Sequence, residues 1–183
     1  MGILSFLTNN NTNPMKVFNW HRFNITDFFD IVLSEGDNQA KLLPDGNIPL
    51  ISAGSTDNGI CKYIAHGDGV SKIFPSNIIT VDMFGKAFYQ PHDFFAVSHG
   101  RVNILIPHTR KYEFELDKYL GLFLVTMIEE RLAQNYTYGE MCNSTSLNKE
   151  TIYIPVKNNN YPDFSGMRNY VKDLYIQASN HIL

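Results

Sequence analysis

The stretch from Asn47 to Tyr89 constrains the fold of this chain more than any other. Its short apolar runs alternate with Gly, Asn, Ser and Thr, as in Ile-Pro-Leu-Ile-Ser-Ala-Gly-Ser-Thr and Ile-Ile-Thr-Val-Asp-Met-Phe-Gly-Lys. β-Branched and aromatic residues bounded by turn formers predict strands, and Asp57-Asn58-Gly59 predicts a hairpin turn of type I′. The turns carry hydrogen-bonding side chains but no catalytic constellation. The region is therefore better suited to reading another surface than to making bonds.

The same criteria predict seven strands, near residues 48–52, 60–64, 77–82, 86–90, 94–98, 101–106 and 151–156. An apolar repeat at i, i+3, i+4 from Leu116 to Leu132 predicts an amphipathic helix over about 115–134, with the apolar stripe in the core. Thr26 is expected to cap a short helix over 26–31. The expected fold class is α/β, in the α+β sense, with a short-stranded, mostly antiparallel β core.

A coiled-coil-like helix is expected at the C-terminal end, from about Asp163 to Ile182. Asp163 or Ser165 would cap it, and its seam has the 3-and-4 spacing of a coiled coil, formed by Phe164, Met167, Val171, Leu174 and Ala178. Such a seam either begins a spacer helix or caps the domain, and the spacing favours neither. The expected organisation is a flexible, polar segment over 1–16, one domain over 17–160 and the helix over 161–183.

Bulk properties exclude several classes of protein. A chain of 183 residues with 44% hydrophobic and 18% charged residues is expected to form one globular domain. Neither a secretory signal nor a run long enough to cross a membrane is recognisable, so a cytoplasmic location is expected. Cys61 and Cys142 form no Cys-x-x-Cys pair, and the histidine spacings match no ligand pattern, so neither a metal nor a cofactor is expected.

Nuclease and methyltransferase motifs are also missing from the sequence. No Lys has Asp or Glu two positions before it, as a metal-dependent nuclease site of the PD-(D/E)xK type would need. An enzyme of another type would require Asp82, His92, Asp93 and His99 to converge in space.

Charge is segregated along the chain, although the net charge is only −3. Residues 61–111 hold six basic and three acidic side chains, whereas the segments before and after them are acidic. A local basic face can attract a polyanion even when the total charge is negative.

Four stretches resemble, in the expected order, the target-recognition domains of type I restriction–modification specificity subunits and of the related type IIB and IIG systems. They are Ile48 to Gly59, Ile79 to Tyr89, Ile152 to Val156, and Pro162-Asp163-Phe164 before Met167, Tyr170 and Val171. The resemblance covers roughly residues 23–176. The order of several weak motifs carries it.

That resemblance implies a domain that grips the DNA major groove, reads half of a bipartite site and docks onto a methyltransferase subunit, with no catalysis of its own. Specificity subunits usually carry two such domains separated by two long helices, but this sequence has one domain and one spacer-type helix. It would then be a half-subunit that forms a homodimer through the C-terminal helix, or a fragment of a larger chain. The alternative from another class is a β-rich protein- or carbohydrate-binding module with an exposed aromatic platform.

Polar side chains in the predicted turns are candidates for contact with duplex DNA. Asn pairs with adenine, Arg and Lys with guanine or phosphate, and Ser or Thr with either. The candidates are Ser55, Thr56, Asn58, Lys62, Lys72, Lys86, His99, Arg101, Tyr138, Asn143 and Ser144. Asn58 also has a purely structural interpretation, because Asn-Gly shapes a tight turn by itself.

Overall fold

The computed structural model describes residues 18–98, 101–133, 135–137 and 139–180, and it contains three β-sheets and three α-helices in this part of the chain. The elements are, in order, β1 (Asn19–Asn24), η3 (Ile25–Asp27), β2 (Phe29–Leu33), β3 (Asp45–Ile51), η4 (Asp57–Gly59), β4 (Ile60–Ile64), β5 (Ile78–Asp82), β6 (Ala87–Gln90), β7 (Phe95–Ala96), β8 (Val102–Pro107), α1 (Lys118–Leu132), α2 (Ser144–Leu147), β9 (Thr151–Val156) and α3 (Phe164–Asn180).

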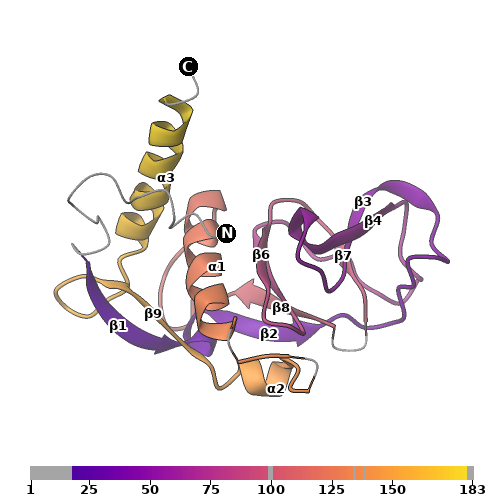
Figure 1. The fold of residues 1–183 in the computed structure, drawn as a ribbon, viewed down its shortest axis with the longest axis horizontal. Helices are drawn as coiled ribbons and strands as arrows, with labels where there is room; N and C mark the ends of the chain where they lie inside the picture. The colour runs from indigo at the N-terminus through magenta and orange to yellow at the C-terminus, as the bar shows by residue number, and fades with distance from the viewer. Residues whose placement is uncertain (1–17, 99–100, 134, 138, 181–183) are drawn as a thin grey trace.

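A four-stranded antiparallel sheet in the order β2-β8-β5-β6 forms the centre of the molecule. A three-stranded sheet in the order β4-β3-β7 lies on one side of it, and a two-stranded ribbon of β1 and β9 lies on the other, next to α1 and α3 (Figure 1). The β3–β7 pair is parallel, whereas the other strand pairs of the described residues are antiparallel. The α+β prediction with a mostly antiparallel core is confirmed.

Strand β5 is buried on both faces because two different layers cover it. Side chains alternate across a strand, so Ile79 and Val81 pack into the core beneath α1, with Leu120 and Leu124. Ile78 faces the other way, into a second core that joins the central sheet to Ile51 of β3. Thr80 and Asp82 share the face of Ile78. Two polar side chains are thereby buried between the central sheet and the three-stranded sheet.

The two long helices confirm the periodic predictions. Helix α1 buries its apolar stripe, and its N-cap Asp117 accepts a hydrogen bond from the Leu120 amide at 2.9 Å. Asp163 accepts from the Gly166 amide at 3.0 Å at the start of α3, as predicted for the cap. The first half of α3 packs on α1, and Arg168 pairs with Asp117 at 2.5 Å. Its second half projects from the domain (Figure 1) and leaves side chains there exposed, among them Tyr175, Ile176 and Ala178.

All seven predicted strands are present, but the helix expected from Thr26 is wrong. A single 3-10 turn, η3, is capped by Asn24, and the chain then continues into β2. Phe29 to Leu33 pair with Asn103 to Pro107 of β8, so tertiary pairing overrides the local helix signal. Strand β1 was not predicted, because only one of its six side chains is fully buried and no alternation is visible.

The Asp57-Asn58-Gly59 turn is confirmed in its backbone geometry. Asp57 and Asn58 have φ of 49° and 52°, and the Gly59 amide donates to the Thr56 carbonyl at 2.9 Å. The turn is the tip of a longer loop, over residues 52–59, rather than a two-residue hairpin. The predicted flexible segment 1–16 lies outside the described residues. Within the described residues, no helix combines the length and apolarity that a membrane crossing requires.

Candidate functional site

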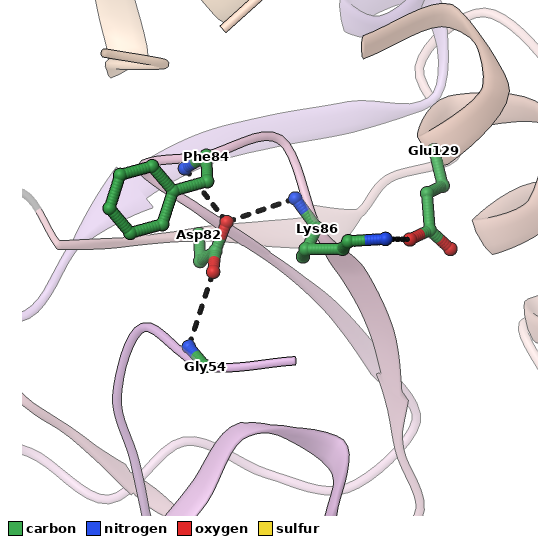
Figure 2. A network of polar contacts seen from close by, with 5 residues as sticks. All are labelled: Gly54, Asp82, Phe84, Lys86 and Glu129. Carbon is green, nitrogen blue, oxygen red and sulfur yellow. Dashed lines mark hydrogen bonds and ion pairs between the residues drawn. The ribbon is translucent and has the colours of Figure 1, made fainter. Parts of the chain in front are cut away.

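The carboxylate of Asp82, at the end of β5, fixes two loops at one end of the central sheet. It accepts hydrogen bonds from the amides of Phe84 at 2.8 Å and Lys86 at 2.9 Å, which closes the β5–β6 turn. Its other oxygen accepts from the Gly54 amide, at 3.2 Å, in the loop between β3 and β4 (Figure 2). Asp82 is only 3% exposed. A buried carboxylate must be paired or hydrogen-bonded, and three backbone donors meet this need.

A second buried side chain holds the other end of the same loop. The Gln90 amide nitrogen donates to the Asn58 carbonyl at 3.0 Å and to the Thr80 hydroxyl at 2.9 Å. The loop 52–59 is thus held at both ends by the central sheet, and its exposed tip carries Ser55, Thr56 and Asn58. These three candidates share one rigid element.

Arg101 and the segment before α2 reach the same end of the sheet. The Met83 amide donates to the Arg101 carbonyl at 3.1 Å, and the Cys142 amide donates to the Met83 carbonyl at 2.9 Å. The Arg101 side chain is exposed and has no partner among the described residues. Asn143 caps α2 through the Ser146 amide at 2.9 Å, which gives its side chain a structural role.

Ser144 is the first residue of α2 and lines an open cavity. The cavity has a volume of about 490 Å³, and its lining also includes Thr145, Lys149 and Tyr136. The structure therefore brings together four sequence-distant segments, namely the loop 52–59, the β5–β6 turn, the start of β8 and the segment around α2.

Two of the candidate lysines lie elsewhere. The Lys62 ammonium donates to the carbonyls of Ala40 at 3.1 Å and Leu43 at 2.8 Å, and it pairs with Asp45 at 2.9 Å. It thereby fastens the segment before β3 to β4. Lys72 is exposed in the loop between β4 and β5, on the side of β5 where the strand begins. His99 and Tyr138 lie outside the described residues.

The basic excess of residues 61–111 largely disappears on folding. Four of its six cations pair with carboxylates from outside the segment, namely Lys62 with Asp45, Lys86 with Glu129, Arg110 with Asp30 and Lys111 with Asp27. Of these six cations, only Lys72 and Arg101 have no ion-pair partner among the described residues. The charge segregation read along the sequence therefore does not translate into a basic face.

The carboxylates that an enzyme would need do not converge. Asp82 ends β5, whereas Asp93 binds the Ser76 amide at 2.8 Å, just before β5 begins. At about 3.3 Å per residue, the two ends of this strand are on the order of 15 Å apart. Burial raises the pKa of the Cys142 thiol to about 12, so this thiol stays protonated at neutral pH. In the parts of the chain that the structure describes, no group of three or more His, Cys, Asp or Glu is placed to hold a metal ion.

Asp82 and Gln90 hold the loop 52–59 in place, but the sequence analysis did not predict this role for either residue. Asp82 had a recognisable signal, because Asp at the first position and Gly at the fourth favour a type I turn, and the Gly85 amide does donate to the Asp82 carbonyl at 3.0 Å. Nothing in the sequence indicates that Gly54 also reaches Asp82, or that Gln90 holds Asn58.

Comparison with known proteins identifies relatives over nearly the whole chain. Residues 18–182 match the family described as type I restriction modification DNA specificity domain. The chain is 27% identical over 160 residues to the Type II restriction enzyme BgcI specificity subunit S.BcgI of Heyndrickxia coagulans, a match that covers 86% of this chain and 44% of that protein.

Two solved structures share the fold. The S subunit of a type I restriction–modification system from M. genitalium superposes with a TM-score of 0.63 at 18% identity, over 95% of this chain and 42% of that one. The HsdS subunit from Thermoanaerobacter tengcongensis gives a TM-score of 0.56 at 14% identity, over 95% and 40%. The chain thus spans less than half the length of each relative.

Proposed function

The chain belongs to the family of type I restriction modification DNA specificity domains, and from this premise we propose that it binds duplex DNA for a restriction–modification system. The chain reads sequence and performs no catalysis itself. A methyltransferase subunit is its partner, and the complex acts in the cytoplasm.

The observation that carries this proposal is the set of three hydrogen bonds that the Asp82 carboxylate accepts from backbone amides. These bonds fix the β5–β6 turn and the loop 52–59, whose exposed tip presents Ser55, Thr56 and Asn58. Hydroxyl and amide groups read base edges in the major groove. A loop that is rigid before binding loses little conformational entropy when it binds. Arg101, exposed at the same end of the sheet, supplies a phosphate or guanine contact.

Assembly is assigned to α3. The exposed Ile176 lies on the half of α3 that projects from the domain, next to Tyr175, whose ring packs edge-on against Tyr119 of α1. A two-fold pairing of such helices would place two recognition surfaces on a symmetric, bipartite site. Analytical ultracentrifugation of the full chain and of Ile176→Glu tests this part separately. A wild-type monomer at concentrations where DNA is bound would rule the homodimer out.

A glycan- or protein-binding module has less support. The exposed tyrosines of the described residues, Tyr63, Tyr153 and Tyr175, lie on β4, β9 and α3, in three different layers. They do not form the aromatic platform that such a module would use.

The test is a fluorescence-anisotropy titration of the full chain against a mixed-sequence duplex pool at 50 and 200 mM salt, with and without the methyltransferase subunit. Affinity that falls with salt and gains sequence selectivity with the subunit supports the proposal. No binding to duplex under any of these conditions contradicts it.

A further inference from the structure

One of the candidate cations is held by a carboxylate from the helix layer. The Lys86 ammonium lies 2.6 Å from Oε1 of Glu129, which is 43 positions later in the chain, in the last turn of α1. The Lys86 side chain is 45% exposed and that of Glu129 is 33% exposed. Figure 2 shows both side chains extending toward each other from the β5–β6 turn and from the helix.

The backbone of Lys86 is part of the turn that the Asp82 carboxylate closes. Its amide is one of the three donors to Asp82, so the ammonium extends from the turn that also anchors the loop 52–59 through Gly54. The Lys86 backbone is therefore held in place, and only a movement of its side chain can bring the ammonium to a different partner.

We propose that Glu129 is a specificity-determining residue. It forms an ion pair with the Lys86 ammonium in the free protein, and this pair gives way to a contact between Lys86 and a DNA phosphate only in the sequence-specific complex. This inference rests on the proposed DNA-binding function. A half-exposed ion pair contributes little to folding, so a well-placed phosphate oxygen can replace the carboxylate.

In a complex with the wrong sequence, the same carboxylate opposes binding. A phosphate that is not positioned to displace Glu129 meets a paired lysine, which releases no counterion, and a nearby negative charge, which repels it. Glu129 therefore weakens the sequence-independent part of the affinity more than the specific part. Discrimination by a repulsive element of this kind is a general route to specificity.

The test compares the wild type with Glu129→Gln, which keeps the side-chain shape and removes the charge. The non-specific probe is the mixed-sequence duplex pool, and the specific probe is a duplex selected from this pool by the wild type. With Lys86 free, non-specific affinity at 50 mM salt is expected to rise roughly three- to tenfold, and the slope of log K against log salt to steepen by about 0.9. Affinity for the selected duplex changes less, so the ratio of specific to non-specific affinity falls.

Two further variants isolate the mechanism. Lys86→Met combined with Glu129→Gln is expected to abolish the gain in non-specific affinity. Asp30→Asn frees Arg110 from a pair of the same kind, 63% and 50% exposed, on an edge strand of the central sheet, and is expected to leave both affinities unchanged. A wild type that binds the selected duplex, together with Glu129→Gln that leaves affinities and slope unchanged, overturns this inference while the proposed function stands. A wild type that binds no duplex overturns both.

Discussion

The carboxylate of Asp82 accepts a hydrogen bond at 3.2 Å from the amide of Gly54, a residue 28 positions earlier in the chain. Because Asp82 also closes the β5–β6 turn, one buried side chain connects the central sheet to the loop that joins β3 and β4 of the three-stranded sheet. The shape of the candidate surface and the stability of the domain therefore depend on the same carboxylate.

Asp82→Asn is expected to lower the free energy of unfolding by about 2–3 kcal/mol. The substitution replaces one acceptor oxygen by an NH₂ group and removes the charge that strengthens the remaining bonds. Hydrogen exchange of the Gly54, Phe84 and Lys86 amides should accelerate more than exchange in α1. Asp93→Asn, which alters an exposed carboxylate bonded to the Ser76 amide, is the matched control. Unchanged protection of Gly54 in Asp82→Asn would show that the bond does not hold the loop.

The elements that sequence predicts well are those with strong local periodicity. Helix α1 was recognisable because the spacing from Leu116 to Leu132 specifies both its type and its buried face. Strands β1 and β2 were missed, because their partners β9 and β8 lie far away in sequence and supply the pairing that local propensity does not.

The candidate site was predictable only in part, for a related reason. Turn chemistry located the exposed tip at Asn58, since positive φ favours Asn and Gly. Whether each cation is paired or free was not predictable, because Lys62 and Lys86 form ion pairs with residues that only the fold brings close to them. A charge count along the sequence cannot separate a free cation from a paired one.

Gly85, in the β5–β6 turn, is expected to tolerate replacement less well than Gly69, which also has a positive φ. The φ of Gly85 is +79°, and a Cβ would lie 2.9 Å from Cβ of Leu132 in α1. Gly85→Ala should therefore combine backbone strain with overpacking, and should lower the free energy of unfolding, measured in urea, by about 2–4 kcal/mol. Gly69 has a φ of +85° but faces open space, so Gly69→Ala should cost only the strain, about 1–2 kcal/mol. Equal losses in the two variants would mean that contact with Leu132 contributes nothing.

Asp68 is expected to make stability depend on acidic pH. Hydrogen bonds from the amides of Ser71, Asp37 and Val70 lower its pKa from 3.8 to about 2, with the Ser71 bond the largest cause. Since the folded-state pKa is below the unfolded one, the stabilisation is present above about pH 4 and is lost as the pH falls toward 2.

Denaturant unfolding between pH 2 and pH 7 checks this expectation. Asp68→Asn should be less stable than the wild type at pH 7, by on the order of 1 kcal/mol because solvent screens the site, and the difference should shrink toward pH 2. Asp57→Asn, at an exposed loop position, is the control. A difference between Asp68→Asn and the wild type that stays constant with pH would show that the charge of Asp68 is not the source.

Lys62 and Arg101 are both candidate DNA contacts, but their environments predict opposite effects. Lys62→Met removes the donor to the Ala40 and Leu43 carbonyls, so it should lower the free energy of unfolding by about 1–2 kcal/mol and leave the salt dependence of DNA binding unchanged.

Arg101→Ala removes an exposed side chain, so the free energy of unfolding should stay within about 0.5 kcal/mol of the wild-type value. If Arg101 contacts phosphate, the slope of log K against log salt should become shallower by about 0.9. Arg22→Ala, an exposed arginine on the β1–β9 ribbon, is the control for a general loss of charge. A shallower slope in Lys62→Met with normal slope in Arg101→Ala would reverse the assignment and move the DNA-binding surface toward β4.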